Sequence, residues 1–442
     1  MKTSAITVGV SPLDLHKMPS QHLGSKVLII SGLLMIAILS GCRPKTSGPL
    51  VQDIYVWQRV WSSEVVTAVE EVVNKSGGRI REVVPLAAEV SLSAGHRAVI
   101  FPEIDYASLK SVPSCGLALR IGAFPGPFKE GDETCLYLQN LACKVVTDAR
   151  KAGCSVSELQ IDFDCAANKL QGYRCWVAAI RKALQTHAEF VPVSITVLPS
   201  WMNSQDFGPL VHEAGSFVLQ VHSVELPNPG EEPVLCDPVR TRAWVERAGS
   251  YGVPYRVALP TYTSVVAISP TGKVVGISNE ETSPAWPADA HTFMARANAP
   301  ELAELVLQWT HQRPASMTGL IWYRLPVSTD RMNWRWPTLV SVMAGKTPRG
   351  SLRVEFSQEN PYDISLVNDG ESDELLPLSI SVNWKEAALI SDDALDGFTL
   401  ENGTHSVTFK ATANNMFLAP GESRVIGWIR LASPTKIHAS EN

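Results

Sequence analysis

The sequence lacks several patterns that mark common functional classes. It has no extended basic run, and its 38 basic and 44 acidic residues give a net charge of −6, so we expect no nucleic-acid binding. It has no CxxC pair, no cysteine and histidine cluster with zinc spacing, and neither a glycine-rich phosphate turn after the first strand nor a Gly-x-Ser-x-Gly elbow. We therefore expect no metal, no cofactor and no serine hydrolase.

Long apolar runs are also scarce, and the one at residues 27–38 is too short to span a bilayer comfortably. It ends in Leu-Ser-Gly-Cys at Cys42, which resembles a bacterial lipobox. The resemblance implies a signal peptide over 1–42, a lipidated Cys42 and a tether over 43–52 that holds the chain to the membrane. Arg43 favours the periplasmic side of the outer membrane in the cell envelope. The alternative is an uncleaved membrane helix.

Seven cysteines follow Cys42, an odd number that cannot all pair within one chain. Disulfides are permitted outside the cytoplasm, and Cys165 with Cys175 is a conceivable local bridge. We expect most of the others to be buried free thiols.

Between residues 53 and 346, short β-branched or aromatic segments alternate with amphipathic helical ones. The predicted strands are 53–61, 79–90, 117–124, 158–166, 191–201, 216–224, 255–262 and 317–326. Their number, order and span match an α/β fold of the (β/α)8 TIM-barrel type. An open doubly wound sheet would have fewer strands and a phosphate-binding turn, so the barrel is favoured.

The pattern changes after Gly350. Short alternating strands separated by turn residues continue to about residue 433. This predicts a small C-terminal β-sandwich domain over 350–433, of immunoglobulin-like type.

Two acids stand out at the end of the fourth predicted strand. In extended backbone Gln160, Asp162 and Asp164 share one face, while the apolar residues between them share the other. If the apolar face packs against helices, the carboxylates point into the barrel, where unpaired charge is costly and is usually retained for function. The alternative is that they cap the next helix or pair with an arginine.

Active sites of such barrels lie at the C-terminal ends of the strands. The candidate catalytic residues there are Asp162, Asp164, Glu89, Glu225 and His222. The candidate substrate-binding residues are Trp57, Gln220, Trp201, Tyr262, Trp322 and Tyr323. Aromatic rings beside carboxylates suit sugars, and glycoside hydrolysis needs an acid and a second carboxylate. The tryptophans can equally be packing residues. His222 can be a barrel-interior histidine that is hydrogen-bonded to an acid, and Glu89 can pair with Arg59 or Arg324.

Four motifs in order resemble a bacterial family of exported proteins classed as domain of unknown function 3142. They are Tyr-Val-Trp-Gln-Arg-Val-Trp (55–61), Leu-Gln-Ile-Asp-Phe-Asp-Cys (159–165), Ser-Ile-Thr-Val-Leu-Pro-Ser-Trp (194–201) and Phe-Val-Leu-Gln-Val-His (217–222). The resemblance implies a barrel and no assigned activity.

More distantly, Asp162-Phe-Asp164 is similar to the Asp-x-Asp-x-Glu motif of chitinase-like glycoside hydrolases, but Ala166 stands where that motif has its catalytic Glu. Two hypotheses follow: a barrel that acts on a carbohydrate, and a non-catalytic glycan-binding or structural envelope lipoprotein. The sugar, the linkage and the oligomeric state stay open.

Overall fold

The computed structural model describes residues 44–93, 96–187, 190–223, 234–279, 285–414 and 416–441. Cys42 and Glu225, two residues that the sequence singled out, lie outside these ranges.

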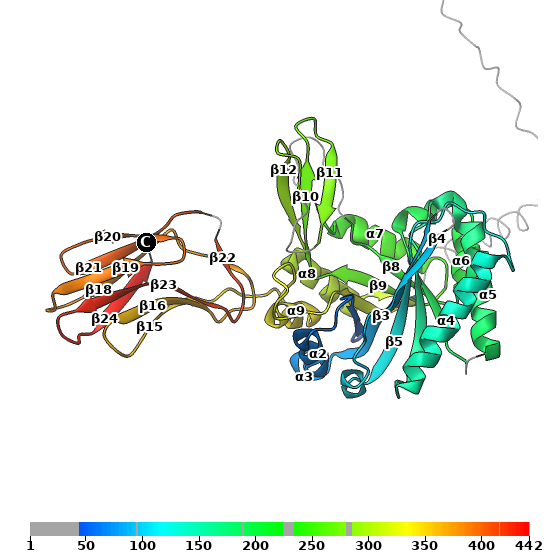
Figure 1. Ribbon diagram of the computed structural model, residues 1–442, viewed down its shortest axis with the longest axis horizontal. Coiled ribbons are helices and arrows are strands. Elements are labelled where there is room, and N and C mark those ends of the chain that lie inside the picture. Colours follow the sequence, from blue (N-terminus) through cyan, green and yellow to red (C-terminus); the bar gives the residue numbers. More distant parts are fainter. Residues whose placement is uncertain are drawn as a thin grey trace, which may run out of the picture. The chain divides into compact units, whose positions relative to one another are not determined.

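Eight parallel strands close into a barrel, which confirms the predicted fold class (Figure 1). They are β2 (Val51–Val56), β3 (Ile80–Ser93), β5 (Ser114–Ile121), β6 (Val156–Asp162), β7 (Val193–Val197), β8 (Phe217–Gln220), β9 (Tyr255–Pro260) and β14 (Met317–Tyr323). The ring closes because β14 pairs with β2, with Ile321 opposite Asp53, and β2 pairs with β3, with Ile54 opposite Val83. The antiparallel strand β4 (His96–Ile100) extends β3 on the outside of the ring.

Helices cover the outer face of the barrel. They are α2 (Ser63–Glu70), α3 (Val72–Lys75), α4 (Glu133–Lys151), α5 (Leu170–His187), α6 (Phe207–Ala214), α7 (Pro238–Gly249), α8 (Ala299–His311) and α9 (Trp336–Met343). Local sequence sets their starts, since Asp132, Asp237 and Asn298 each accept a hydrogen bond from a backbone N–H of the first turn. At the other end of α6, Gly215 adopts a left-handed conformation with φ of 84°, which glycine permits without strain.

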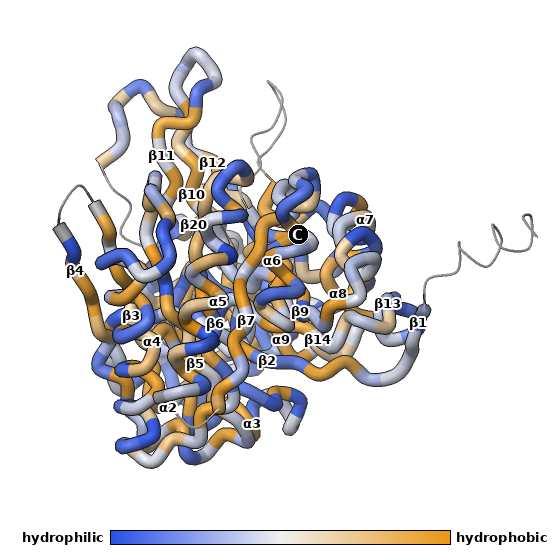
Figure 2. The backbone as a smooth tube through the Cα atoms, turned by 90° about the vertical axis from the view of Figure 1, so that its right-hand side faces the viewer, coloured by the Kyte–Doolittle hydropathy of each residue, from blue (hydrophilic) through white to orange (hydrophobic). Residues whose placement is uncertain are grey.

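The main core lies between the strands and these helices. Leu159, Ile161 and Phe163 are fully buried there, as their alternation with polar residues predicted. Hydrophobic colour runs along barrel strands such as β7 in Figure 2. The opposite face of each strand points into the barrel. A second apolar cluster there includes Val84, Val218 and Ile321, and polar side chains lie above and below it.

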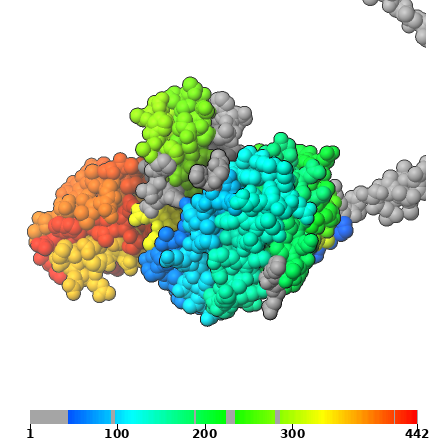
Figure 3. Space-filling model, turned by 45° about the vertical axis from the view of Figure 1, so that its right-hand side comes forward, coloured from blue at the N-terminus to red at the C-terminus, as the bar shows by residue number. Residues whose placement is uncertain are grey.

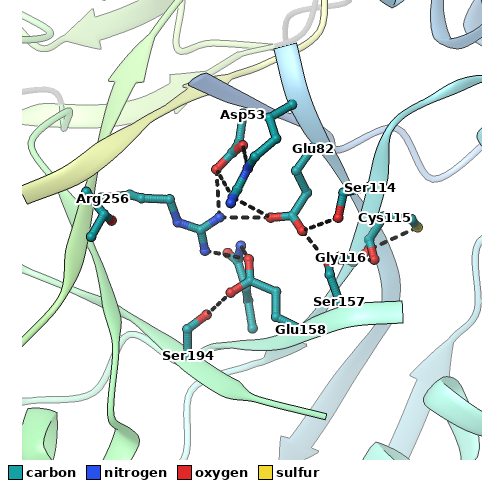
Figure 4. Close-up of polar contacts among 12 residues, drawn as sticks. Asp53, Glu82, Ser114, Cys115, Gly116, Ser157, Glu158, Ser194 and Arg256 are labelled. Atoms are coloured by element: carbon teal, nitrogen blue, oxygen red, sulfur yellow. Dashed lines mark hydrogen bonds and ion pairs between the residues drawn. The ribbon is translucent and has the colours of Figure 1, made fainter. Parts of the chain in front are cut away.

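An ion cluster fills the barrel near the N-terminal ends of the strands (Figure 4). The Arg256 guanidinium donates to Asp53 at 2.8 Å, to Glu82 at 2.9 Å and to Glu158. Burial, followed by the charges of Glu158 and Asp53, raises the pKa of Glu82 to about 7. The buried carboxylates of Asp53 and Glu82 and the partly buried carboxylate of Glu158 thus share one buried guanidinium, and Arg81, bonded to Asp53, adds a second positive charge.

A polar column connects this cluster to the upper half of the barrel. Gln160 donates to Glu158 at 2.6 Å, and the Tyr55 hydroxyl donates to Gln160 at 2.6 Å. The column fixes Tyr55 below the C-terminal ends of the strands.

Three features depart from the predicted element list. The fifth predicted strand stops at Val197 because Pro199 begins a 3-10 helix, η3 (Pro199–Asn203), and has no N–H for a strand ladder. Helix α6 was not predicted. A three-stranded antiparallel sheet was also missed, and it stands out from the barrel as a green lobe in Figure 3. It comprises β10 (Thr263–Ile268), β11 (Val274–Ser278) and β12 (His291–Arg296).

The C-terminal region contains two four-stranded antiparallel sheets, in the orders β15-β16-β23-β19 and β20-β21-β18-β24. Their strands are β15 (Leu352–Phe356), β16 (Tyr362–Asn368), β18 (Ser379–Trp384), β19 (Leu389–Ala394), β20 (Phe398–Asn402), β21 (Ser406–Ala411), β23 (Ser423–Leu431) and β24 (Ile437–Glu441). Their apolar residues form a separate core that includes Ile364, Val382 and Phe409. The predicted antiparallel β region is therefore present, and β19 and β24 are strands that the sequence pattern did not reveal.

Candidate active site

Asp162 is the last residue of β6 and points into the barrel. Its side chain accepts hydrogen bonds from Thr196 Oγ1 at 2.7 Å and from Gln220 Nε2 at 3.2 Å, both on Oδ1. Burial raises the pKa of Asp162, while these two hydrogen bonds and the charge of Arg120 oppose the rise. The carboxyl group is therefore held in a fixed orientation by side chains from β7 and β8.

Asp164 lies two residues beyond the strand end and is exposed. Neighbouring protein atoms still desolvate its carboxyl, and with the nearby charge of Asp162 they raise its pKa to about 6, while Arg120 acts in the opposite direction. A carboxyl with such a pKa is partly protonated near neutral pH, so it can donate a proton. Phe163, buried between the two acids, fixes the backbone from which both project.

Glu89 of β3 is paired with Arg59, as one interpretation of the sequence expected. Arg59 Nε donates to one carboxylate oxygen at 2.8 Å and a terminal nitrogen donates to the other at 3.0 Å. Arg120 Nε lies 3.9 Å from Glu89 Oε1 and 3.9 Å from Asp162 Oδ2. The Glu89 and Asp162 carboxylates are therefore within about 8 Å of each other, because each is 3.9 Å from the same nitrogen.

Aromatic side chains form a second group at the strand ends. The ring of Tyr323 stacks on His222 with centroids 5.2 Å apart, and lies edge-on to Tyr262 at 5.4 Å and to Trp57 at 5.5 Å. His222 Nδ1 lies 3.2 Å from the Tyr262 hydroxyl, and burial lowers its pKa to about 4, so the imidazole is neutral near pH 7. Tyr55, at the top of the polar column, contacts Trp57 edge-on at 5.3 Å.

A cavity of about 770 Å³ opens beside these rings, and we call it the strand-end cavity. Its lining residues are Trp57, Gln58, Arg59, Val60, Ser62, Val65, Glu89, Arg120, Ile277, Ser278, Asn279, Tyr323, Arg324, Val327, Thr329 and Asp330. Asp162 and Asp164 are not among them. Arg120 links Asp162 to the cavity, because Arg120 lines the cavity and its Nε lies 3.9 Å from Asp162 Oδ2.

Two tryptophans that were predicted to bind the substrate, Trp201 and Trp322, are buried in the structure. Trp201 is 1% exposed, and its indole donates to the Cys165 carbonyl at 3.0 Å. Trp322 is fully buried and donates to Gln52 at 2.9 Å. Adjacent residues of a strand face opposite ways, so with Tyr323 in the barrel Trp322 must face the helices. Neither tryptophan can stack on a ligand.

The structure also adds residues that the sequence analysis missed. Arg120 is the penultimate residue of β5, Thr196 is the penultimate residue of β7, and Gln58 follows β2, so a systematic list of strand ends would have found all three.

Within the described ranges no cluster of His, Cys, Asp and Glu could hold a metal ion. The seven cysteines there are free, including Cys165 and Cys175, so the conceivable bridge between them is absent. No helix in the described part of the chain is long and apolar enough to cross a membrane.

Solved structures with a similar arrangement have low sequence identity to this chain. Chitinase ChiA74 from Bacillus thuringiensis is 9% identical over 89% of this chain and 100% of that chain, with a TM-score of 0.42. The spore cortex-lytic enzyme SleL from Bacillus cereus is 11% identical over 68% and 75%, with a TM-score of 0.44. A glycoside hydrolase family 18 N-acetylglucosaminidase from Paenibacillus barengoltzii is 12% identical over 67% and 99%, with a TM-score of 0.42.

Curated protein sequences show no significant match to this chain. Family models match two segments. Residues 353–432, which hold most of the C-terminal strands, match the domain of unknown function DUF8456. Residues 131–328, from α4 to the end of the barrel, match the domain of unknown function DUF3142, the family that the four sequence motifs resemble.

Proposed function

We propose that the C-terminal face of the barrel binds a carbohydrate and that Asp164 donates a proton to the glycosidic oxygen of that ligand. One observation carries the proposal: aromatic rings and hydrogen-bonding acids meet at the same strand ends, beside a cavity of about 770 Å³. The apolar face of a sugar ring packs on aromatic side chains, while its hydroxyls need polar partners.

Asp164 is the best-suited acid because its pKa of about 6 keeps part of the population protonated near neutral pH. In the proposed reaction its proton passes to the leaving oxygen as the bond from that oxygen to the anomeric carbon breaks. A water molecule forms the new bond to the anomeric carbon and gives its proton to a second carboxylate.

Asp162 and Glu89 are the two candidates for the second carboxylate. Asp162 is fixed by Thr196 and Gln220, and Glu89 lines the cavity. Glu89 is already engaged by Arg59, so Asp162 is the better candidate for direct proton transfer.

A second function, glycan binding without turnover, is favoured by a specific observation. Ala166 occupies the position at which the chitinase-like motif has its catalytic glutamate, and Ala166 is exposed. The chain therefore has no carboxyl group at this position. The aromatic rings and polar side chains would then retain a glycan without cleaving it.

Hydrolysis of a panel of aryl glycosides and polysaccharides tests the proposal. Wild type is compared with Asp164→Asn and with the matched control Asp363→Asn, a change at an exposed aspartate of β16. We expect turnover by wild type and by the control, and a loss of about 10²- to 10⁴-fold in Asp164→Asn. Equal turnover by all three would remove Asp164 from the mechanism, and binding without turnover would establish the second function.

We also propose that Cys42 is lipidated and anchors the chain in the bacterial envelope. The support is the sequence Leu-Ser-Gly-Cys after an apolar run. Labelling of cells with a palmitate analogue should mark the wild-type protein and leave Cys42→Ala unmarked. Equal labelling of both would refute the anchor, and the membrane fraction in which the labelled protein appears tests the outer-membrane location.

A further inference from the structure

The strand-end cavity is lined by more arginines than acids, although the chain as a whole has a net charge of −6. Arg59, Arg120 and Arg324 line it, against two acids, Glu89 and Asp330. The lining therefore has a formal charge of +1, and Asp162, whose Oδ2 lies 3.9 Å from Arg120 Nε, is a third acid beside it.

The three arginines differ in how far their donors are used. Arg59 makes two hydrogen bonds to Glu89, at 2.8 and 3.0 Å. Arg324 donates to Asp330 at 3.0 Å and to the Asn279 carbonyl at 3.3 Å.

Arg120 makes no hydrogen bond to any residue in the described ranges, and its two nearest carboxylate oxygens are both 3.9 Å from Nε. Its side chain is 41% exposed. Among the arginines of the cavity, Arg120 thus has a planar fork of N–H donors without a hydrogen-bond partner in the described part of the chain, and such a fork matches a carboxylate in shape and charge.

Gln58 supplies a complementary group. Its Oε1 atom is buried and accepts no hydrogen bond from the described part of the chain. Gln58 lines the same cavity as Arg120, next to Trp57. A buried acceptor without a donor is costly, so a ligand hydroxyl that reached this atom would gain a hydrogen bond.

We propose that the ligand of the strand-end cavity is an acidic saccharide, with a sugar carboxylate bound by Arg120 and a sugar hydroxyl bound by Gln58 Oε1. The rings of Trp57 and Tyr323 then form the apolar wall. The inference rests on the proposed carbohydrate function and specifies its substrate class. Two acids lie 3.9 Å from Arg120 Nε. Glu89 is already held by Arg59 in a two-bond pair, and Asp162 accepts hydrogen bonds from Thr196 and Gln220.

Calorimetric titration of the full-length protein tests this assignment. The probes are oligogalacturonate, oligoguluronate and muramic-acid-containing fragments, each paired with its carboxyl methyl ester, together with a sulfated neutral oligosaccharide. The variants are Arg120→Gln and, as a matched control, Arg430→Gln at an exposed arginine of β23. We expect at least one acidic probe to bind roughly tenfold to hundredfold more tightly than its ester. The preference should disappear in Arg120→Gln and persist in Arg430→Gln.

The outcomes separate the two proposals. If esters bind as tightly as acids, or if Arg120→Gln keeps the preference, the acidic substrate class is refuted while carbohydrate binding stands. If the sulfated probe binds and the carboxylates do not, the assignment of a carboxylate is also refuted. If no saccharide in the panel binds, the acidic class is refuted, and the hydrolysis panel described above then decides the proposed function. Circular dichroism of Arg120→Gln shows whether that variant is folded.

Discussion

Replacing Arg256 by methionine should destabilise the barrel strongly. The guanidinium is the buried partner of Asp53, Glu82 and Glu158, whose side chains are 0%, 3% and 13% exposed. The substitution keeps most of the apolar volume but leaves three acids crowded in the interior of the barrel. Removing one partner of a buried ion pair typically costs about 3–5 kcal/mol, and we expect a loss of that size in the free energy of unfolding near neutral pH.

Urea denaturation followed by circular dichroism measures this loss. The matched control is Arg81→Met, because Arg81 also pairs with Asp53 but its side chain is 53% exposed. Because the Arg81 guanidinium is exposed while that of Arg256 is buried, the control should lose clearly less than Arg256→Met. Adding Glu82→Gln to Arg256→Met should recover part of the stability by removing one of the crowded charges. Equal losses for the two arginine variants would show that Arg256 is not the main partner of the three acids.

Further predictions concern pH and the aromatic residues. Turnover that needs protonated Asp164 should fall as pH rises through about 6, and a pH–rate profile without that decline would contradict the acid role. Glu82 has a pKa of about 7 in the folded chain and an ordinary value of 4.5, so the folded state holds the extra proton between these values. Stability should therefore decrease as pH rises from 4.5 through 7, by on the order of 3 kcal/mol, and Glu82→Gln should flatten that dependence in urea titrations. Trp57→Ala should weaken saccharide binding by about tenfold and should cost less stability than Trp201→Ala, because Trp57 is only partly buried. Trp201→Ala should instead lower the free energy of unfolding by roughly 3–5 kcal/mol, since it empties a buried site; a reversed pattern in calorimetry and denaturation would show that the two tryptophans have been assigned the wrong roles.

The sequence was most informative where a local period determines the structure. Alternation along β6 indicated that Leu159 and Ile161 pack outward and that Asp162 points inward, and the structure has this arrangement. The count of strand and helix segments was sufficient to predict the closed barrel because each unit repeats the same local pattern.

Relations between distant residues could not be read in the same way. Arg256 forms ion pairs with acids from β2, β3 and β6, and no spacing in the sequence predicts these contacts. The choice between Trp322 and Tyr323 as the inward ring depends on register, since a shift of one residue reverses the faces of a strand. The sheet β10–β12 was missed because its strands pair with each other and not with the barrel.

The most direct test of the carbohydrate site is a crystal structure of the protein with an oligosaccharide that it binds in titration. We expect a sugar ring against Trp57 and Tyr323 in the strand-end cavity, with a glycosidic oxygen within hydrogen-bonding distance of the Asp164 carboxyl. An oligosaccharide bound away from the strand ends, or one whose glycosidic oxygens all lie beyond the reach of Asp164, would contradict it.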